Sequence, residues 1–161
     1  MRIIKCFSKF STLTHTGPNK MVNVGTKQDT PRYAKASCII NTTPEVINLI
    51  KSNQIAKGDV IRTAEIAGIL AAKKTSELIP LCHQINLNTV NIKIEIKDSS
   101  LHIESYAECV GKTGVEMEAL VAANIASLTI YDMCKSADKG IVISECKLVE
   151  KFGGKSGHYK I

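Results

Sequence analysis

The stretch TVNIKIEIKDSSLHIESYAEC, residues 89–109, alternates apolar and polar side chains on either side of a short polar turn. Apolar residues occupy every second position from Val90 to Ile96, and small or apolar residues do so from Leu101 to Cys109. Successive side chains of a strand point to opposite faces, so this period of two is typical of half-buried strands. The polar residues 98–100 are turn formers. The stretch therefore predicts an antiparallel hairpin.

The segments around this hairpin predict further elements. Gly111 and Gly114 end the hairpin, and Asp59 can cap a helix that stops before Pro80. The expected elements are strand 36–40, helix 45–52 after Pro44, helix 60–76, helix 115–135 and strand 141–148. This order predicts an α+β protein with a ferredoxin-like split βαβ arrangement, in which the helices pack on one face of an antiparallel sheet.

Length and composition predict one globular domain. The chain has 161 residues, of which 44% are hydrophobic and 22% charged, which excludes a disordered chain and a disulfide miniprotein. The longest uncharged stretch in a helical context, residues 119–131, is shorter than the roughly 20 residues of a membrane helix, so we expect no membrane span. We expect residues 1–20 to be a flexible basic tail or transit peptide, and residues 21–161 to be the folded domain.

The net charge of +6 is concentrated at the two ends of the chain. Residues 1–28 contain five Lys or Arg and residues 151–161 contain three, without any acidic residue in either segment. The intervening body is slightly acidic, whereas a protein that binds nucleic acid usually carries a basic stripe on its folded body. This distribution argues against a nucleic-acid partner, and it is compatible with a small polyanion such as a nucleotide triphosphate.

The cysteines and the N-terminus bear on the cellular compartment. The six cysteines are scattered and have no recognisable metal-binding spacing, so we expect reduced thiols and no protein-held metal. No secretory signal is present, which indicates a reducing compartment. Residues 1–11 are basic, contain Ser and lack acids, as transit peptides do, although a simple basic tail has the same composition. The expected location is the mitochondrial matrix in a eukaryote and the cytoplasm otherwise.

Two groups of polar residues lie at opposite ends of the long predicted helix. Residues 111–118, GKTGVEME, place glycines and acids at its start, where they serve either as helix capping or as an anion site. Asp132 and Lys135, three residues apart near its end, form either a plain surface ion pair or an acid/base pair. Glu118 and Asp132 are separated by roughly 21 Å of helix, so one small substrate cannot touch both in one chain. If both groups are functional, each site needs two protomers.

The same helix is apolar on more sides than one sheet covers, which also predicts oligomerisation.

Several motifs together resemble one family. They are MVNV at 21–24, KGDV at 57–60, AGI at 67–69, LIPLCH at 78–83, KTGVEMEAL at 112–120, LTIYDMCK at 128–135 and GGKSG at 153–157. In this order and spacing they resemble the cyclic pyranopterin monophosphate synthase family, the molybdenum cofactor biosynthesis protein C family. Asn23, where the family usually has Asp, and Gln84, where Pro commonly follows the His, depart from its pattern.

The resemblance implies a lyase of molybdenum cofactor (molybdopterin) biosynthesis. Its substrate would be (8S)-3′,8-cyclo-7,8-dihydroguanosine 5′-triphosphate, supplied by an upstream radical enzyme of the same pathway, and its products cyclic pyranopterin monophosphate and diphosphate. The resemblance also implies a homohexamer, a trimer of dimers with sites at the dimer interface. We expect no cofactor, although a divalent cation can accompany the triphosphate.

The resemblance implies roles for individual residues. The catalytic group would be Asp132, Lys135 and Lys57. The substrate-binding residues would be Leu81, Cys82, His83, Glu116, Met117 and Glu118, with Arg32, Lys151 and Lys155 as phosphate partners.

Two readings without catalysis stay open from the residues alone. A noncatalytic ferredoxin-like module that binds a nucleotide or RNA would need aromatic side chains on the outer face of its sheet, and the predicted hairpin offers only Tyr106 there. A noncatalytic oligomeric scaffold would assemble without turning substrate over.

Overall fold

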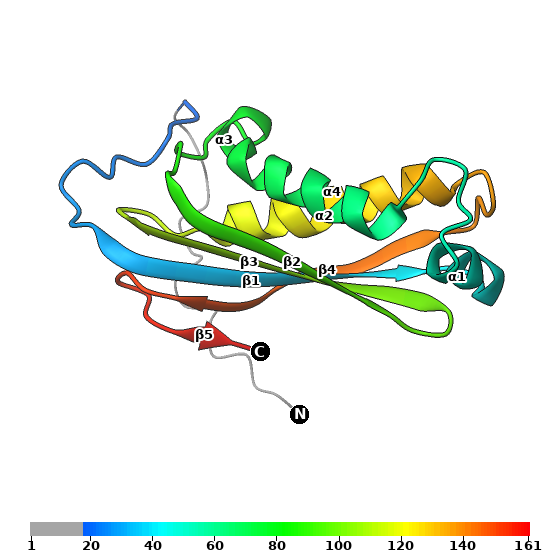
Figure 1. Ribbon diagram of the computed structural model, residues 1–161. Coiled ribbons are helices and arrows are strands. Elements are labelled where there is room, and N and C mark those ends of the chain that lie inside the picture. Colours follow the sequence, from blue (N-terminus) through cyan, green and yellow to red (C-terminus); the bar gives the residue numbers. More distant parts are fainter. Residues whose placement is uncertain (1–17) are drawn as a thin grey trace.

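The computed structural model describes residues 18–161, which form a five-stranded sheet and four helices (Figure 1). The elements are β1 (Thr30–Asn41), α1 (Pro44–Lys51), α2 (Val60–Lys73), α3 (Thr75–Leu78), β2 (Leu87–Ile96), β3 (Ser100–Gly111), α4 (Glu116–Cys134), β4 (Val142–Phe152) and β5 (Tyr159–Lys160). The two long helices α2 and α4 lie side by side over one face of the sheet, and no helix formed by residues 18–161 covers the other face (Figure 1).

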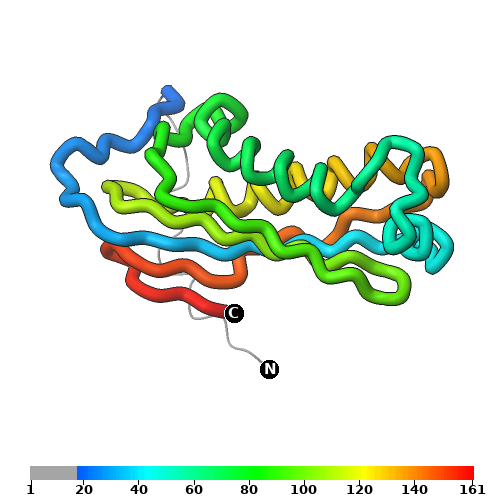
Figure 2. The backbone as a smooth tube through the Cα atoms, in the orientation of Figure 1, coloured from blue at the N-terminus to red at the C-terminus, as the bar shows by residue number. Residues whose placement is uncertain are grey.

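The sheet has the order β2-β3-β1-β4-β5, and every neighbouring pair is antiparallel. The predicted hairpin forms as β2 and β3, with Ile94 opposite Ile103. Strand β1 lies between β3 and β4, so two segments far apart in the sequence flank it, as the path of the chain in Figure 2 shows. This α+β arrangement confirms the ferredoxin-like prediction.

Several elements differ in length from the prediction. The first strand was expected at 36–40, but β1 extends over Thr30–Asn41 because its backbone pairs with β3 along that whole length. The helix expected at 60–76 ends at Lys73, and a separate helical turn, α3, follows. Strand β5 was not predicted, since two residues are too short to show any alternation.

The core lies between the sheet and α4. Ala34, Ala36, Cys38 and Ile40 alternate along β1 and are completely buried. Small residues on α4, including Ala119 and Ala123, also have no exposed surface, which lets this helix lie close to the strands. The face of β1 that carries these side chains is therefore the inner face, and the intervening residues point to the outer face of the sheet.

Helix α2 covers a second side of α4. Gly68 makes this contact possible, because a Cβ there would lie 2.8 Å from the carbonyl oxygen of Ala122 and 2.1 Å from Cδ1 of Ile92. The apolar circumference of α4 is thus buried partly by α2 within the same chain. The apolar circumference of α4 alone therefore does not require a partner chain, and oligomerisation stays a prediction.

The boundary between a tail and the domain stays a prediction. Residues 1–17, most of the predicted tail or transit peptide, lie outside the described residues. None of the helices in residues 18–161 is long and apolar enough to cross a membrane.

Candidate functional site

Lys57, Asp132 and Lys135 come together at the C-terminal end of α4. The Lys57 Nζ atom lies 2.5 Å from Oδ2 of Asp132 and donates a second hydrogen bond of 3.1 Å to its carbonyl oxygen. The Lys135 Nζ atom lies 2.8 Å from Oδ1 of the same carboxylate. Lys57 is brought there by the turn before α2, where Gly58 has a φ of 102° that favours glycine. We call these three residues the lysine–aspartate cluster.

Within one chain this cluster is open to solvent. The three side chains are 49–53% exposed, so within a single chain Asp132 and Lys135 have the geometry of a surface ion pair, the first of the two alternatives left open by the sequence. The hydrogen bonds from Lys135 and Lys57 lower the pKa of Asp132 to about 2, and the bond to Asp132 raises the pKa of Lys135. Each group therefore holds the other in its charged form. Proton transfer would require a ligand or a second surface that changes this environment.

A cavity of about 830 Å³ lies at the other end of the molecule, next to the N-terminus of α4. Four cationic side chains line it together with threonine, serine and glycine residues. The cations are Lys27, Arg32, Lys112 and Lys155. Among the described residues that line it, Glu116 is the one acid. The combination of several cations with small polar groups suits a polyanion, so we call it the anion cavity.

Arg32 is fixed at the wall of the anion cavity by contacts to two backbone segments. Its Nε atom donates a 2.8 Å hydrogen bond to the carbonyl oxygen of Gly111. A Cβ at Gly154 would lie 2.2 Å from Nη1 of Arg32, and Gly154 has a φ of 71°. The positive φ favours glycine at this position, and the absence of a side chain leaves room for the guanidinium group of Arg32.

A second cavity of about 330 Å³ adjoins the first. The two share four lining residues, Lys27, Thr113, Gly114 and Glu116, so they are adjacent compartments of one site. The second compartment is more apolar, with Val22, Val24, Leu81, Ile85 and Met117 in its lining, and we call it the apolar cavity. A flat heterocycle attached to a polyanion matches this pair of compartments.

His83 and Cys82 reach the apolar cavity from the loop after α3. The Nε2 atom of His83 is 2.8 Å from the carbonyl oxygen of Val22, a contact that joins this loop to the segment preceding β1. That segment is itself held by the 3.1 Å hydrogen bond from Lys112 Nζ to the carbonyl oxygen of Gly25. Asn23 accepts a hydrogen bond from the Gly25 amide, as the Asp usual in the family also can.

Glu118 is a buried carboxylate beside the apolar cavity. The residue is 3% exposed, and its Oε2 atom has no hydrogen-bond partner in the described part of the chain. Burial, with a smaller contribution from the nearby Glu116, raises the pKa of Glu118 to about 7. Glu118 stands in the first turn of α4, whose N-cap residue Val115 makes no side-chain hydrogen bond. An orphaned buried oxygen at a cavity indicates a ligand donor that completes it.

Replacing Glu118 with Gln should change how the stability of the protein depends on pH. Between the ordinary pKa of 4.5 and the raised value of about 7, the folded state binds more protons than the unfolded state, so the free energy of unfolding falls as pH rises. Glu118→Gln removes this dependence. Between pH 5 and pH 7.5, we expect the free energy of unfolding of the variant to rise by on the order of 1–2 kcal/mol relative to that of wild type. Urea unfolding of both proteins at the two pH values, at one protein concentration, measures it, and parallel pH curves would contradict it.

The structure gathers most of the predicted substrate-binding residues and separates them from the predicted catalytic ones. Those lining the two compartments are Leu81, Cys82, His83, Glu116, Met117, Glu118, Arg32 and Lys155. Lys151 does not line either: it is 9% exposed and its Nζ atom donates to the Ser156 hydroxyl. Glu118 and Asp132 stand at opposite ends of α4, as predicted, roughly 21 Å apart along its axis.

Sequence reasoning missed two cations of the anion cavity, Lys27 and Lys112. Lys112 stands in the quoted motif beside Gly111, and Lys27 belongs to the basic, acid-free segment before β1. The motif and the basic segment are both recognisable in the sequence, but nothing in the sequence indicates that Lys27 and Lys112 lie beside Lys155.

The described cysteines and acidic residues form no metal centre. Cys38, Cys82, Cys109, Cys134 and Cys146 are free thiols. No group of three or more His, Cys, Asp or Glu side chains within residues 18–161 is placed to hold a metal ion.

Comparison with known proteins bears on the family. Residues 21–154 match the MoaC family. A curated relative from Peptoclostridium acidaminophilum, named cyclic pyranopterin monophosphate synthase, is 47% identical over 152 residues, which cover 94% of this chain and 97% of the relative. The residues matched by the family include the lysine–aspartate cluster and all lining residues of the two compartments except Lys155 and Ser156. The chain belongs to the MoaC family, which the sequence motifs resemble.

Proposed function

We propose that this protein is a cyclic pyranopterin monophosphate synthase, a lyase of molybdenum cofactor biosynthesis. It converts (8S)-3′,8-cyclo-7,8-dihydroguanosine 5′-triphosphate to cyclic pyranopterin monophosphate and diphosphate. The observation that carries the proposal is the two-compartment site, in which a cavity lined by four cations adjoins an apolar cavity with a buried carboxylate. The name of the similar protein from Peptoclostridium acidaminophilum supports the same activity.

The apolar cavity takes the purine-derived ring. Its volume of about 330 Å³ accommodates a fused bicyclic ring, and Leu81 and Met117 supply apolar contacts to the ring faces. The 2-amino group and the adjacent ring N–H of such a base are a pair of donors, and the unpartnered Oε2 of Glu118 is an acceptor. Pairing with them would favour the ionised form of Glu118 and would discriminate against bases without the amino group.

The anion cavity takes the triphosphate. Lys112, Lys155 and Arg32 can contact phosphate oxygens, and the N-terminus of α4 adds backbone N–H groups nearby. Forming the cyclic phosphate makes a new bond between the α-phosphorus and a substrate hydroxyl oxygen, and it breaks the bond from that phosphorus to diphosphate. The cations stabilise the negative charge that develops on this leaving group. A divalent cation can enter with the triphosphate as part of the substrate.

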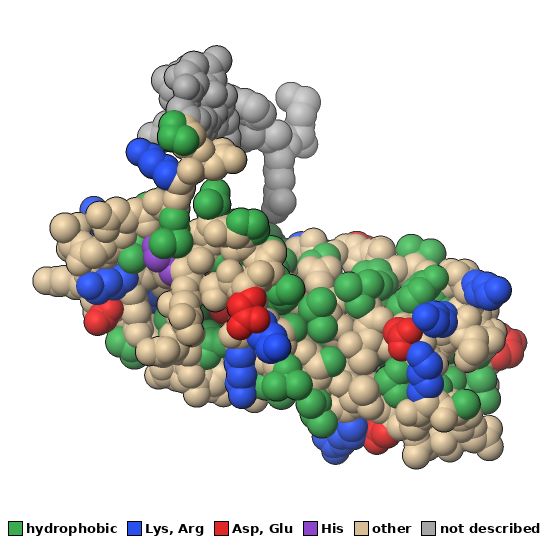
Figure 3. All heavy atoms as spheres, turned by 90° about the horizontal axis from the view of Figure 1, so that it is seen from above, with side chains coloured by type: hydrophobic (Ala, Val, Ile, Leu, Met, Phe, Trp, Pro, Cys, Tyr) green, Lys and Arg blue, Asp and Glu red, His purple; other side chains and the backbone are tan. Residues whose placement is uncertain are grey.

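Each complete site is formed by two chains. The lysine–aspartate cluster and the two compartments are at opposite ends of α4, so a small substrate bound in the compartments cannot reach the cluster of its own chain. A two-fold axis across the α2/α4 layer would place the cluster of one chain over the compartments of the other. Apolar side chains gather on this face, which Figure 3 shows from above. Exposed apolar residues of α2 and α4 are Ile66, Leu70 and Leu128.

This pairing also supplies what the cluster lacks in one chain. A partner surface and a bound substrate would exclude water from Asp132, Lys57 and Lys135, and the resulting desolvation favours the neutral forms of all three groups. The carboxylate and the ammonium groups can then exchange protons with the ring as it opens and recloses. We propose that three such dimers form the hexamer.

Turnover of the purified nucleotide tests the function directly. We expect wild-type protein to release diphosphate and the cyclic pterin in equal amounts, measured by a coupled phosphate assay and by mass spectrometry. The same protein should not release diphosphate from GTP, which lacks the 3′,8 bond. Binding of the cyclic nucleotide without any product would instead favour the noncatalytic nucleotide-binding alternative.

The RNA-binding alternative receives less support from the outer face of the sheet. This face carries more aromatic side chains than the predicted Tyr106 alone, because Tyr33 stacks between Tyr106 and Phe152 at centroid distances of 5.8 and 5.5 Å. The rings stack on one another, and the Tyr33 and Tyr106 hydroxyls donate to Glu150 and Glu108, so carboxylates stand where RNA phosphates would approach.

The proposed cellular compartment of the protein depends on its N-terminal segment. We propose that residues 1–20 direct the protein to the mitochondrial matrix if the source is a eukaryote, and that the protein is cytoplasmic otherwise. Imaging of residues 1–28 fused to a fluorescent protein tests this, and a diffuse cytosolic signal in a eukaryotic host would contradict targeting.

A further inference from the structure

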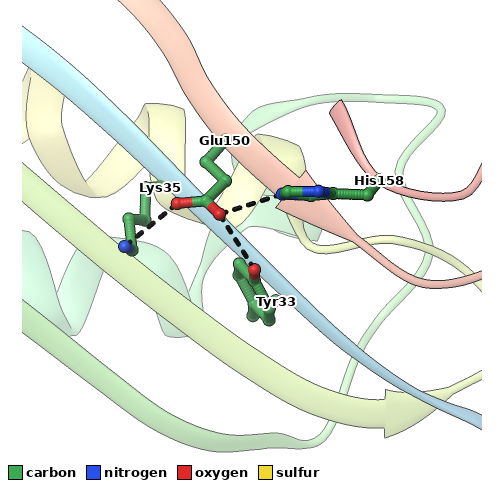
Figure 4. Close-up of polar contacts among 4 residues, drawn as sticks. All are labelled: Tyr33, Lys35, Glu150 and His158. Atoms are coloured by element: carbon green, nitrogen blue, oxygen red, sulfur yellow. Dashed lines mark hydrogen bonds and ion pairs between the residues drawn. The ribbon is translucent and has the colours of Figure 1, made fainter. Parts of the chain in front are cut away.

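Glu150, near the end of β4, is a nearly buried carboxylate with three hydrogen-bond partners on two other segments. Its side chain is 10% exposed and accepts from the Tyr33 hydroxyl at 3.0 Å and from Lys35 Nζ at 3.1 Å, both on β1. The third partner is His158, whose Nε2 is 2.9 Å from Oε1 (Figure 4). We call these four residues the Glu150 cluster. It lies on the outer face of the sheet, and none of its members lines either cavity.

The contact between Glu150 and His158 closes a loop. Glu150 precedes the glycine-rich segment 153–157 and His158 follows it, so their contact joins the two ends. Three glycines of this segment, Gly153, Gly154 and Gly157, have positive φ values of 99°, 71° and 62°. Three residues with few steric restrictions make the segment costly to hold in one conformation.

The loop closed in this way forms one wall of the anion cavity. Gly154, Lys155 and Ser156 line the cavity, and Gly154 lies against the guanidinium group of Arg32. On the inner side, Lys151 donates to the Ser156 hydroxyl. Lys151 thus holds the loop from the inner side of the sheet, and Glu150 holds it from the outer side. The loop residues between these two contacts line the anion cavity.

Aromatic packing orients His158 toward Glu150. The imidazole lies edge-on to Phe152, with 6.2 Å between ring centroids, and Phe152 stacks on Tyr33. Pairing of β4 with β5 places Tyr159 opposite Lys151 and so brings the chain back alongside β4. Hydrogen bonds from His158, Lys35 and Tyr33 lower the pKa of Glu150 to about 2, so this acceptor stays ionised over the whole physiological range.

We propose that the Glu150–His158 contact is a positioning device, which holds the 153–157 loop in the conformation that binds the diphosphate part of the substrate. This rests on the proposed function for the identity of the ligand. Neither residue touches the ligand. They act by reducing the conformational entropy that Lys155, Ser156 and the glycine backbone lose when phosphate binds.

The test compares three histidine variants in binding inorganic diphosphate. His158→Ala removes the contact, His158→Gln keeps an N–H donor near the position of Nε2, and His102→Ala removes an exposed histidine at the other end of the same sheet face. Titration calorimetry should show about 10-fold weaker diphosphate binding by His158→Ala, near wild-type binding by His158→Gln and unchanged binding by His102→Ala.

Steady-state kinetics and hydrogen exchange separate positioning from a general loss of structure. His158→Ala should raise KM about 10-fold with kcat within about 2-fold of wild type. Amide exchange should accelerate within 153–157 and stay unchanged in α4. Glu150→Gln, which keeps the acceptor oxygen but not the charge, should fall between wild type and His158→Ala.

Several results would overturn the inference. They are wild-type diphosphate affinity in His158→Ala, equal losses in His158→Ala and His102→Ala, or no diphosphate binding by the wild-type protein. A protein that binds diphosphate in a His158-dependent manner but does not turn over the cyclic nucleotide would contradict the proposed function and leave the positioning role of the cluster intact.

Discussion

Asp132→Asn should reduce kcat by about 10³-fold and leave the fold unchanged. The substitution keeps the size of the side chain and one acceptor oxygen, but the amide can neither take up nor release a proton. It also removes the charge that holds Lys57 at 2.5 Å and Lys135 at 2.8 Å. Because the side chain is half exposed, the core does not depend on it. Diphosphate release measured at saturating substrate, together with the circular dichroism melting curve, provides both readouts.

The matched control for this prediction is Glu95→Gln. Glu95 pairs with Lys97 on the edge strand β2, and its side chain is 55% exposed, close to the 52% of Asp132. We expect Glu95→Gln to retain wild-type turnover, since exposed ion pairs contribute little by themselves. If Asp132→Asn turned over substrate at a near-normal rate with an intact fold, the catalytic assignment of the lysine–aspartate cluster would be wrong.

Two inactive variants should restore activity when they are combined in one oligomer. One is Asp132→Asn, which damages the cluster, and the other is the double variant Lys112→Ala/Lys155→Ala, which damages the anion cavity. In a mixed dimer, one of the two sites receives the intact cluster of one chain and the intact cavity of the other. With random pairing, about a quarter of all sites are complete, and in purified mixed dimers about half are, so about a quarter to a half of wild-type activity should return. Co-expression of two differently tagged chains followed by tandem purification enriches the mixed dimer.

The control for complementation places both lesions in the same half of the site. Asp132→Asn combined with Lys57→Ala leaves each possible site with a damaged cluster, and we expect no recovery. A site formed within one chain would give no recovery in either combination, so failure of the first pair to complement would contradict the two-chain site. Sedimentation analysis of each mixture verifies that the chains have associated.

The sequence predicted the elements more reliably than their lengths. The hairpin at 89–109 and the long helix carry their own periodic signals, because the strand and helix periods place apolar residues on one face. The extension of β1 back to Thr30 carried no such signal. Tyr33 and Lys35 lie on the outer face of the sheet, where they contact Phe152 and Glu150, residues that are far from them in the sequence. The pairing of β1 with two distant strands, which sets its length, is a tertiary property.

The electrostatic state of the site could not be predicted from residue types. From the sequence, Asp132 and Lys135 were open to interpretation either as a surface ion pair or as an acid/base pair. Helix α4 directs both side chains to the surface, and their ion pair shifts the pKa of each group toward its charged form. Glu118 was open to interpretation as a capping residue, and its burial raises its pKa to about 7. Burial depends on what packs against a side chain, which neighbours in the sequence do not reveal.

The amino-acid sequence by itself determined the α+β class, the order of the elements, the family and the separation of Glu118 from Asp132, because each depends on periodicity, motif spacing or helical rise. Only the tertiary structure decided that Lys27, Arg32, Lys112 and Lys155 surround one cavity, and that Glu150 and His158 close the loop beside it. The four cations belong to separate segments of the chain that the fold brings together. Their proximity results from strand pairing between distant parts of the chain, for which no local pattern exists.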